Sequence, residues 1–177
     1  MSNMSFYLSF FFFILLCSFA ISWISMAPWV PTRSKDLRRC ISVLDLKKGD
    51  IFLEIWSGDG RVSRTIAKAF PEAKIVGVEM TSPLFLYTYL GNIFFPLRNL
   101  TFVFWNAFKQ DFGDYDAIYV YGMPDKMSQK IVPKFMKEAK VWTKLYSYVF
   151  SIPEEYRKWV VSHWGENQAK IHVLEKK

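Results

Sequence analysis

Charged residues are missing from the start of this 177-residue chain, where the first Lys, Arg, Asp or Glu is Arg33. The chain has only two cysteines, which excludes a small domain held together by disulfides. Because 51% of the residues are hydrophobic, a disordered or collagen-like chain is excluded as well. The two histidines, His163 and His172, have no cysteine or carboxylate cluster at ligand spacing, so we expect no metal site.

Several functional motifs are also missing. The sequence contains no G-x-S-x-G nucleophile motif, and no P-loop lysine follows its glycine-containing loop. The net charge of +7 would suit a nucleic acid, but no aromatic and basic recognition motif accompanies it. We therefore expect no nucleic-acid partner. Attraction to anionic lipid is enough to explain the basic residues that follow the uncharged segment.

Residues 6–24 form an uncharged run that is rich in phenylalanine. As a helix, this run would extend about 28 Å, close to the ~30 Å thickness of a bilayer's hydrocarbon core. Trp23 and Trp29 lie where aromatic side chains meet lipid headgroups. The run predicts a transmembrane anchor, with residues 1–32 comprising the anchor and a short linker. A cleaved signal peptide and a buried core helix are the alternatives, although a basic start and a small-x-small cleavage site are not clear.

The residues after the run predict its orientation. Arg33, Lys35, Arg38 and Arg39 follow at once, whereas the N-terminal flank carries no basic side chain. Basic residues concentrate on the cytoplasmic side of membrane segments. We therefore expect a single-pass membrane protein with a cytoplasmic C-terminal domain, and membrane lipid as the partner of the N-terminal helix.

Residues 33–177 alternate apolar strands with helices, and the connections are short. Strands are expected over residues 51–55, 74–78, 100–105, 116–121, 141–152 and 170–174. Helices are expected over residues 35–46, 62–70, 82–90, 124–139 and 154–161. This order predicts one α/β domain with a Rossmann-like, doubly wound and mostly parallel sheet.

Informative residues lie where the expected strands end, the edge at which such sheets bind ligands. Gly58 and Gly60 allow the backbone to approach a ligand closely. Glu79 follows Gly60 by nineteen residues, about the spacing at which an acid accepts both hydroxyls of a ribose. Asn106, after the third strand, offers an amide to an adenine edge. Together these residues predict a site for a nucleoside cofactor.

The loop itself indicates which cofactor binds. Ser63 stands where a dinucleotide fingerprint has its third glycine. The stretch Glu54–Gly60 instead resembles motif I, E/D-x-G-x-G-x-G, of class I S-adenosylmethionine-dependent methyltransferases. This resemblance implies S-adenosylmethionine as the cofactor, with Ser57 in the binding loop and Glu54 receiving the cofactor's ammonium group.

A narrower resemblance covers the chain from Pro28 to about Tyr156. It rests on four segments: Val30-Pro31-Thr32, Ser57 to Arg61, Gly77 to Glu79, and Tyr119 to Tyr121 with Pro124. In this order they resemble the small membrane-anchored protein-lysine methyltransferases of the FAM173 type and their bacterial relatives. The resemblance implies a methylated lysine in a membrane-proximal protein.

Two aromatic residues need separate interpretation. Trp56 replaces the first glycine of motif I, so we expect its indole to point elsewhere or partly fill the cofactor site. Tyr121 ends the fourth strand, nearest the transferred methyl in this fold, and is the candidate catalytic residue because its ring can contact a lysine by cation–π interaction. Tyr119 is expected in the core.

Two alternatives to a methyltransferase stay open: a non-catalytic binding domain in which Trp56 blocks the cofactor, and a nicotinamide-dependent Rossmann enzyme.

Overall fold

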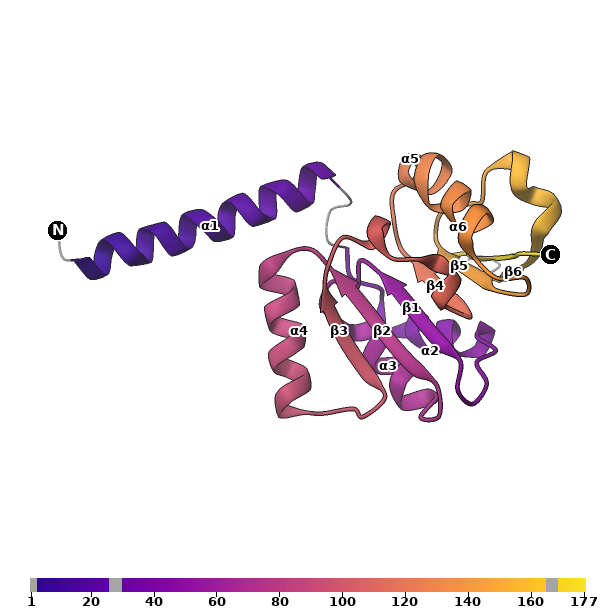
Figure 1. Cartoon of the computed structure of the whole chain (residues 1–177), viewed down its shortest axis with the longest axis horizontal. Helices are drawn as coiled ribbons and strands as arrows, with labels where there is room; N and C mark the ends of the chain where they lie inside the picture. Colours follow the sequence, from indigo (N-terminus) through magenta and orange to yellow (C-terminus); the bar gives the residue numbers. More distant parts are fainter. Residues whose placement is uncertain (1–2, 26–29, 165–168) are drawn as a thin grey trace.

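A computed structural model describes residues 3–25, 30–164 and 169–177. Helix α1 (Asn3–Ser25) extends away from an α/β domain (Figure 1). Within the part of the chain that the structure describes, no helix is long and apolar enough to cross a membrane. Pro28, Trp29 and the side chain of Trp23, on which the predicted membrane boundary depends, lie outside the described residues.

Among the described residues, seven strands form one sheet in the order β3-β2-β1-β4-β5-β7-β6. The strands are β1 (Ile51–Ile55), β2 (Lys74–Glu79), β3 (Leu100–Phe104), β4 (Ala117–Val120), β5 (Lys144–Tyr148), β6 (Val160–Trp164) and β7 (Ile171–Glu175). The first five strands run parallel, β7 is antiparallel to β5, and β6 is antiparallel to β7. This topology confirms the predicted Rossmann-like, mostly parallel sheet.

Helices cover both faces of this sheet (Figure 1). The helices of the domain are α2 (Ser34–Val43), α3 (Arg61–Ala69), α4 (Ser82–Phe94), α5 (Pro124–Lys126), η3 (Met127–Ile131) and α6 (Val132–Glu138), with short 3₁₀ turns η1 (Ala107–Lys109), η2 (Phe112–Asp114) and η4 (Glu154–Trp159). In β1, Phe52 packs with α2 and α3, whereas Leu53 packs with α6 on the other face. Burial on both sides explains why this strand reads as a nearly continuous apolar run.

Several predicted elements differ from the structure, including the helix predicted over residues 35–46, which ends at Val43. The strand predicted over residues 141–152 is shorter, because Trp142 and Val149 beyond its ends both have φ of 73°, which is not strand geometry. The helix predicted over residues 154–161 is only a 3₁₀ segment and is followed by β6, which was not predicted. Helix α4 continues past Gly91 instead of ending at Leu90.

The register of the parallel strands positions the site. Ile55 at the end of β1 is paired with Val78 of β2 on one side and Val120 of β4 on the other. The loops that follow these three strands therefore emerge side by side at one edge of the sheet.

Candidate functional site

The loop after β1 turns tightly over the end of the sheet. The Ser57 N–H donates to the carbonyl of Val78 at 2.9 Å, and the Gly60 N–H donates to the carbonyl of Ser57 at 2.8 Å. Gly58 and Gly60 have φ of 56° and 72°, which glycine adopts without steric cost. A Cβ on Gly60 would also lie 2.5 Å from the Phe102 ring, so this position requires glycine.

Glu79 ties the ends of β1 and β2 together from a buried position. Its Oε2 accepts the Gly58 N–H at 2.8 Å. Its Oε1 accepts the Met80 and Thr81 N–H groups at 2.9 and 2.7 Å. The two oxygens of a carboxylate offer about four lone-pair sites, so Glu79 keeps the capacity to accept one more hydrogen bond, as a ribose hydroxyl requires.

Glu54 lies beneath the loop and is buried. Its Oε2 accepts hydrogen bonds from the backbone N–H of Ser63, at 2.8 Å, and from the Ser63 hydroxyl. Burial raises the pKa of Glu54 to about 8, although the Ser63 bonds act in the opposite direction. The side chain therefore connects β1 to the first turn of α3, and the prediction that it receives an ammonium group stays a prediction.

Trp56 has φ of 58°, the left-handed conformation that a glycine would adopt without strain. The turn of motif I is thus retained despite the bulky side chain. The indole packs edge-on against Phe108, with ring centroids 5.7 Å apart, and contacts the position where a Cβ of residue 122 would lie. It is accommodated at the end of β4 because residue 122 is glycine.

Two buried polar atoms in this loop have no hydrogen-bond partner among the described residues, namely Nε1 of Trp56 and Oγ of Ser57. Buried polar groups in proteins are nearly always satisfied, so unpaired ones at a loop of this kind point to a bound ligand. The loop therefore fits a polar cofactor: two unpaired groups, a carboxylate with spare capacity, and glycines that permit close approach.

Asn106 and Tyr121 lie at the neighbouring strand ends. Oδ1 of Asn106 accepts the Phe108 N–H at 3.0 Å, so the Asn106 amide N–H₂ is the group left to donate to an adenine edge. Tyr121 is half-buried, with its ring centroid 4.8 Å from that of Tyr148 and 6.1 Å from that of Phe150. Burial raises the pKa of Tyr121, partly offset by Arg33, so the phenol stays neutral at neutral pH. Tyr119 is buried in the core as predicted.

Sequence reasoning missed Ser63, Phe108 and Gly122. The sequence interpretation used Ser63 only as evidence against a dinucleotide fingerprint, whereas its hydroxyl donates a hydrogen bond to Glu54. Phe108 and Gly122 hold the Trp56 indole, a long-range contact that the spacing of residues does not indicate. Within the described part of the chain, no group of three His, Cys, Asp or Glu side chains is arranged to hold a metal ion.

Proteins that are similar to this chain in sequence or in structure are methyltransferases. No family model matches the chain. A protein from Saccharolobus islandicus named protein-lysine N-methyltransferase is 29% identical over 136 residues, which cover 75% of this chain and 82% of that protein. Among solved structures, an RNA methyltransferase from Salinibacter ruber, in complex with S-adenosyl-L-homocysteine, superposes with a TM-score of 0.73 and 18% identity, covering 82% of this chain and 93% of that one.

A second solved structure is similar to the same region. It is an S-adenosylmethionine-dependent O-methyltransferase from Thermotoga maritima, with a TM-score of 0.66 and 14% identity, covering 84% of this chain and 67% of that one. The chain thus has the fold of class I S-adenosylmethionine-dependent methyltransferases, as the sequence predicted. It also has a homologue named as a protein-lysine methyltransferase.

Proposed function

We propose that this protein is an S-adenosylmethionine-dependent methyltransferase that methylates a lysine of a membrane-proximal protein. The observation that carries the proposal is the loop after β1, in which Glu79 fixes the Gly58 N–H while Trp56 Nε1 and Ser57 Oγ remain unpaired. The lysine specificity is supported by the name of the Saccharolobus islandicus homologue.

The residues at the strand ends would hold the cofactor. Glu79 accepts a ribose hydroxyl, Asn106 donates to the adenine edge, and the glycine turn lets the backbone come close. When bound, S-adenosylmethionine supplies an electrophilic methyl group, so the protein's main contribution is to align the acceptor and to exclude water.

The part of the candidate site that would receive the substrate lysine is rich in aromatic residues. Tyr121, directly after β4, packs against the buried Tyr148 at the end of β5 and against Phe150 just beyond it. Such rings stabilise a lysine that approaches as a cation, and the surrounding apolar surface lowers its pKa, so that the neutral nucleophilic amine forms. The neutral Tyr121 hydroxyl is then available to orient that amine.

We also propose that α1 anchors the protein in a lipid bilayer as a single-pass segment, with the α/β domain in the cytoplasm. The described part of the helix does not itself meet the requirement for a span. The proposal rests instead on the uncharged sequence of residues 6–24 and on exposed phenylalanines such as Phe12 and Phe13. The basic residues from Arg33 to Arg39 favour cytoplasmic orientation.

The activity can be tested with the full chain and S-adenosylmethionine that carries a radioactive methyl group. Membrane and soluble fractions of the source cells serve as acceptors, and the Glu79→Ala variant serves as the inactive control. We expect label in membrane-associated protein that is recovered as methyl-lysine after acid hydrolysis. Label that nuclease removes, or label recovered on another amino acid, would contradict lysine specificity. Equal labelling with Glu79→Ala would contradict the site itself.

A further inference from the structure

Helix α4 exposes an apolar surface where a surface helix normally carries charge. Its thirteen residues include no Asp, Glu, Lys or Arg. The side that faces the domain is held by the buried Thr88 and by Asn92, whose Nδ2 donates to the carbonyl of Leu100 at 3.1 Å. The exposed large apolar residues of the outward side and the helix end include Leu86, Tyr87, Leu90, Ile93, Phe94 and Phe95, which are 41–73% exposed.

The apolar surface continues onto the edge strand of the sheet. Phe85 of α4 packs against Phe104 of β3 with ring centroids 5.2 Å apart. Phe104 and the adjacent Trp105 are themselves about half exposed. We call the six residues listed above, together with Phe104 and Trp105, the α4 face. An exposed apolar patch that covers the outward side of a helix and continues onto the neighbouring edge strand marks an interaction surface.

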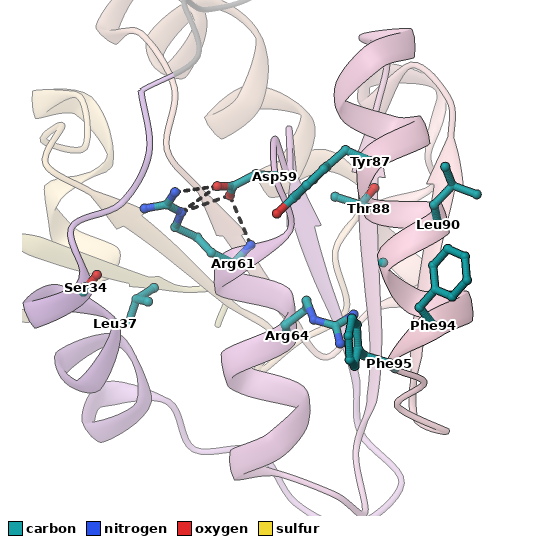
Figure 2. A pocket seen from close by; sticks show the side chains of 11 residues that line it. Ser34, Leu37, Asp59, Arg61, Arg64, Tyr87, Thr88, Leu90, Phe94 and Phe95 are labelled. Atoms are coloured by element: carbon teal, nitrogen blue, oxygen red, sulfur yellow. Dashed lines mark hydrogen bonds and ion pairs between the residues drawn. The ribbon is translucent and has the colours of Figure 1, made fainter.

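Cations border the C-terminal end of α4. Arg64 of α3 donates from Nη2 to the carbonyl of Phe95 at 2.6 Å. Figure 2 shows this guanidinium beside Phe95, with Phe94 and Leu90 nearby, around a cavity of about 670 Å³. Lys68, four residues after Arg64, and Arg98, three residues after Phe95, are both exposed. Neither α3 nor α4 contains an acidic residue, and Asp59, which also lines the cavity, is paired with Arg61.

The position of α1 favours lipid as the occupant of this surface. The uncharged helix α1 contacts α4 and extends away from the domain on the side where α4 lies, crosswise to it (Figure 1). A bilayer that holds α1 would thus meet α4 lengthwise, with aromatic side chains at the depth of the headgroups. A cationic border beside an apolar surface is complementary to anionic phospholipid.

We propose that the α4 face is a lipid-binding surface that lies in the headgroup region of an anionic bilayer. This interaction rests on the membrane placement of α1 proposed above, but it involves a different surface from α1 and does not depend on methyl transfer. It would fix the orientation of the domain, and therefore of the strand ends that carry the candidate site, relative to the membrane.

The test uses the full chain in a Cys17→Ser background, because the remaining Cys40 is buried. Phe94→Cys carries an environment-sensitive fluorophore. Val141→Cys is the matched control, because Val141 is exposed and lies just before β5, which three strands separate from β3 in the sheet. The vesicles contain phosphatidylcholine and about one-third phosphatidylglycerol, which makes them anionic. A nitroxide-labelled lipid in the same vesicles quenches any fluorophore that enters the bilayer. When vesicles are added, we expect the fluorescence emission of the label at position 94 to shift to shorter wavelength and to be strongly quenched. The label at position 141 should show neither change.

Two results would overturn the proposal. One is a chain that floats with the vesicles while the label at position 94 stays as water-exposed as that at position 141, which would mean that α1 alone binds lipid. The other is a shift at position 94 that follows protein concentration without lipid, which would mean that α4 pairs with a second copy.

Charge supplies a second readout. Replacing Lys68 and Arg98 by Gln should reduce binding of the α4 face to anionic vesicles about fivefold per cation, because each contributes about 1 kcal/mol near such a surface. Lys137→Gln with Lys177→Gln is the control, since both lysines are exposed on other parts of the domain. Equal effects of the two pairs would contradict a specific cationic border.

Discussion

The indole of Trp56 occupies the space in which a side chain at residue 122 would begin. A Cβ built on Gly122 would lie 3.1 and 3.3 Å from the Cε3 and Cη2 atoms of that indole, and closer still to Cζ3. The two residues belong to loops that follow the adjacent strands β1 and β4. Gly122 thus explains how a tryptophan is tolerated at the first glycine position of motif I.

Gly122→Ala should therefore destabilise the protein. The new methyl group must displace the Trp56 ring from Phe108, and overpacking of this kind costs about 1–3 kcal/mol. Urea unfolding measures the change, and Gly91→Ala is the control because a Cβ there meets nothing within 4 Å. In a Trp56→Gly background the Gly122→Ala cost should disappear. An unchanged cost in that background would show that the two residues do not interact.

Glu54 should make the stability depend on pH. Burial raises its pKa from 4.5 to about 8, so between these values the folded state binds more protons than the unfolded state. The free energy of unfolding should therefore fall by a few kcal/mol as the pH rises from about 5 to 8. Glu54→Gln should flatten this dependence while keeping an acceptor for Ser63. Parallel pH curves for the two proteins, measured by urea unfolding, would refute the assignment.

Tyr121 should act through its hydroxyl rather than through cofactor binding. Tyr121→Phe keeps the ring contacts with Tyr148 and Phe150. We expect unchanged affinity for S-adenosylmethionine but about tenfold slower methyl transfer, the loss of one hydrogen bond of about 1.4 kcal/mol. Transfer of labelled methyl groups measures the rate, with Tyr156→Phe as the matched control. A rate equal to that of the unchanged protein would assign Tyr121 to packing alone.

The sequence was sufficient where local pattern determines structure. The apolar run of β1 and the spacing from Gly60 to Glu79 predicted the sheet and the location of the candidate site, because burial on both faces and strand-end geometry leave strong local signals. The positive φ values of Trp142, before the start of β5, and of Val149, after its end, could not be predicted, since such residues seldom adopt them. β6 was missed because it follows directly after the short 3₁₀ segment η4.

Within the site, the prediction failed where partners are distant in sequence. Whether Trp56 fills or leaves the site depends on Gly122 and Phe108, and no local pattern connects these residues. The exposed apolar side of α4 could not be predicted either. An apolar helical sequence predicts a buried helix, and only the packing of the neighbouring elements shows that one side is exposed.

The most direct test of the central claim is calorimetric titration of S-adenosylmethionine, S-adenosylhomocysteine and NAD into the full chain. Glu79→Ala should abolish binding because it removes the acceptor that holds the Gly58, Met80 and Thr81 N–H groups. Glu72→Ala, which removes an exposed carboxylate paired with Lys48, is the control. We predict micromolar binding of the two methionine-derived ligands, lost only in Glu79→Ala. Binding of NAD alone, or no binding even in a Trp56→Gly variant, would contradict the account.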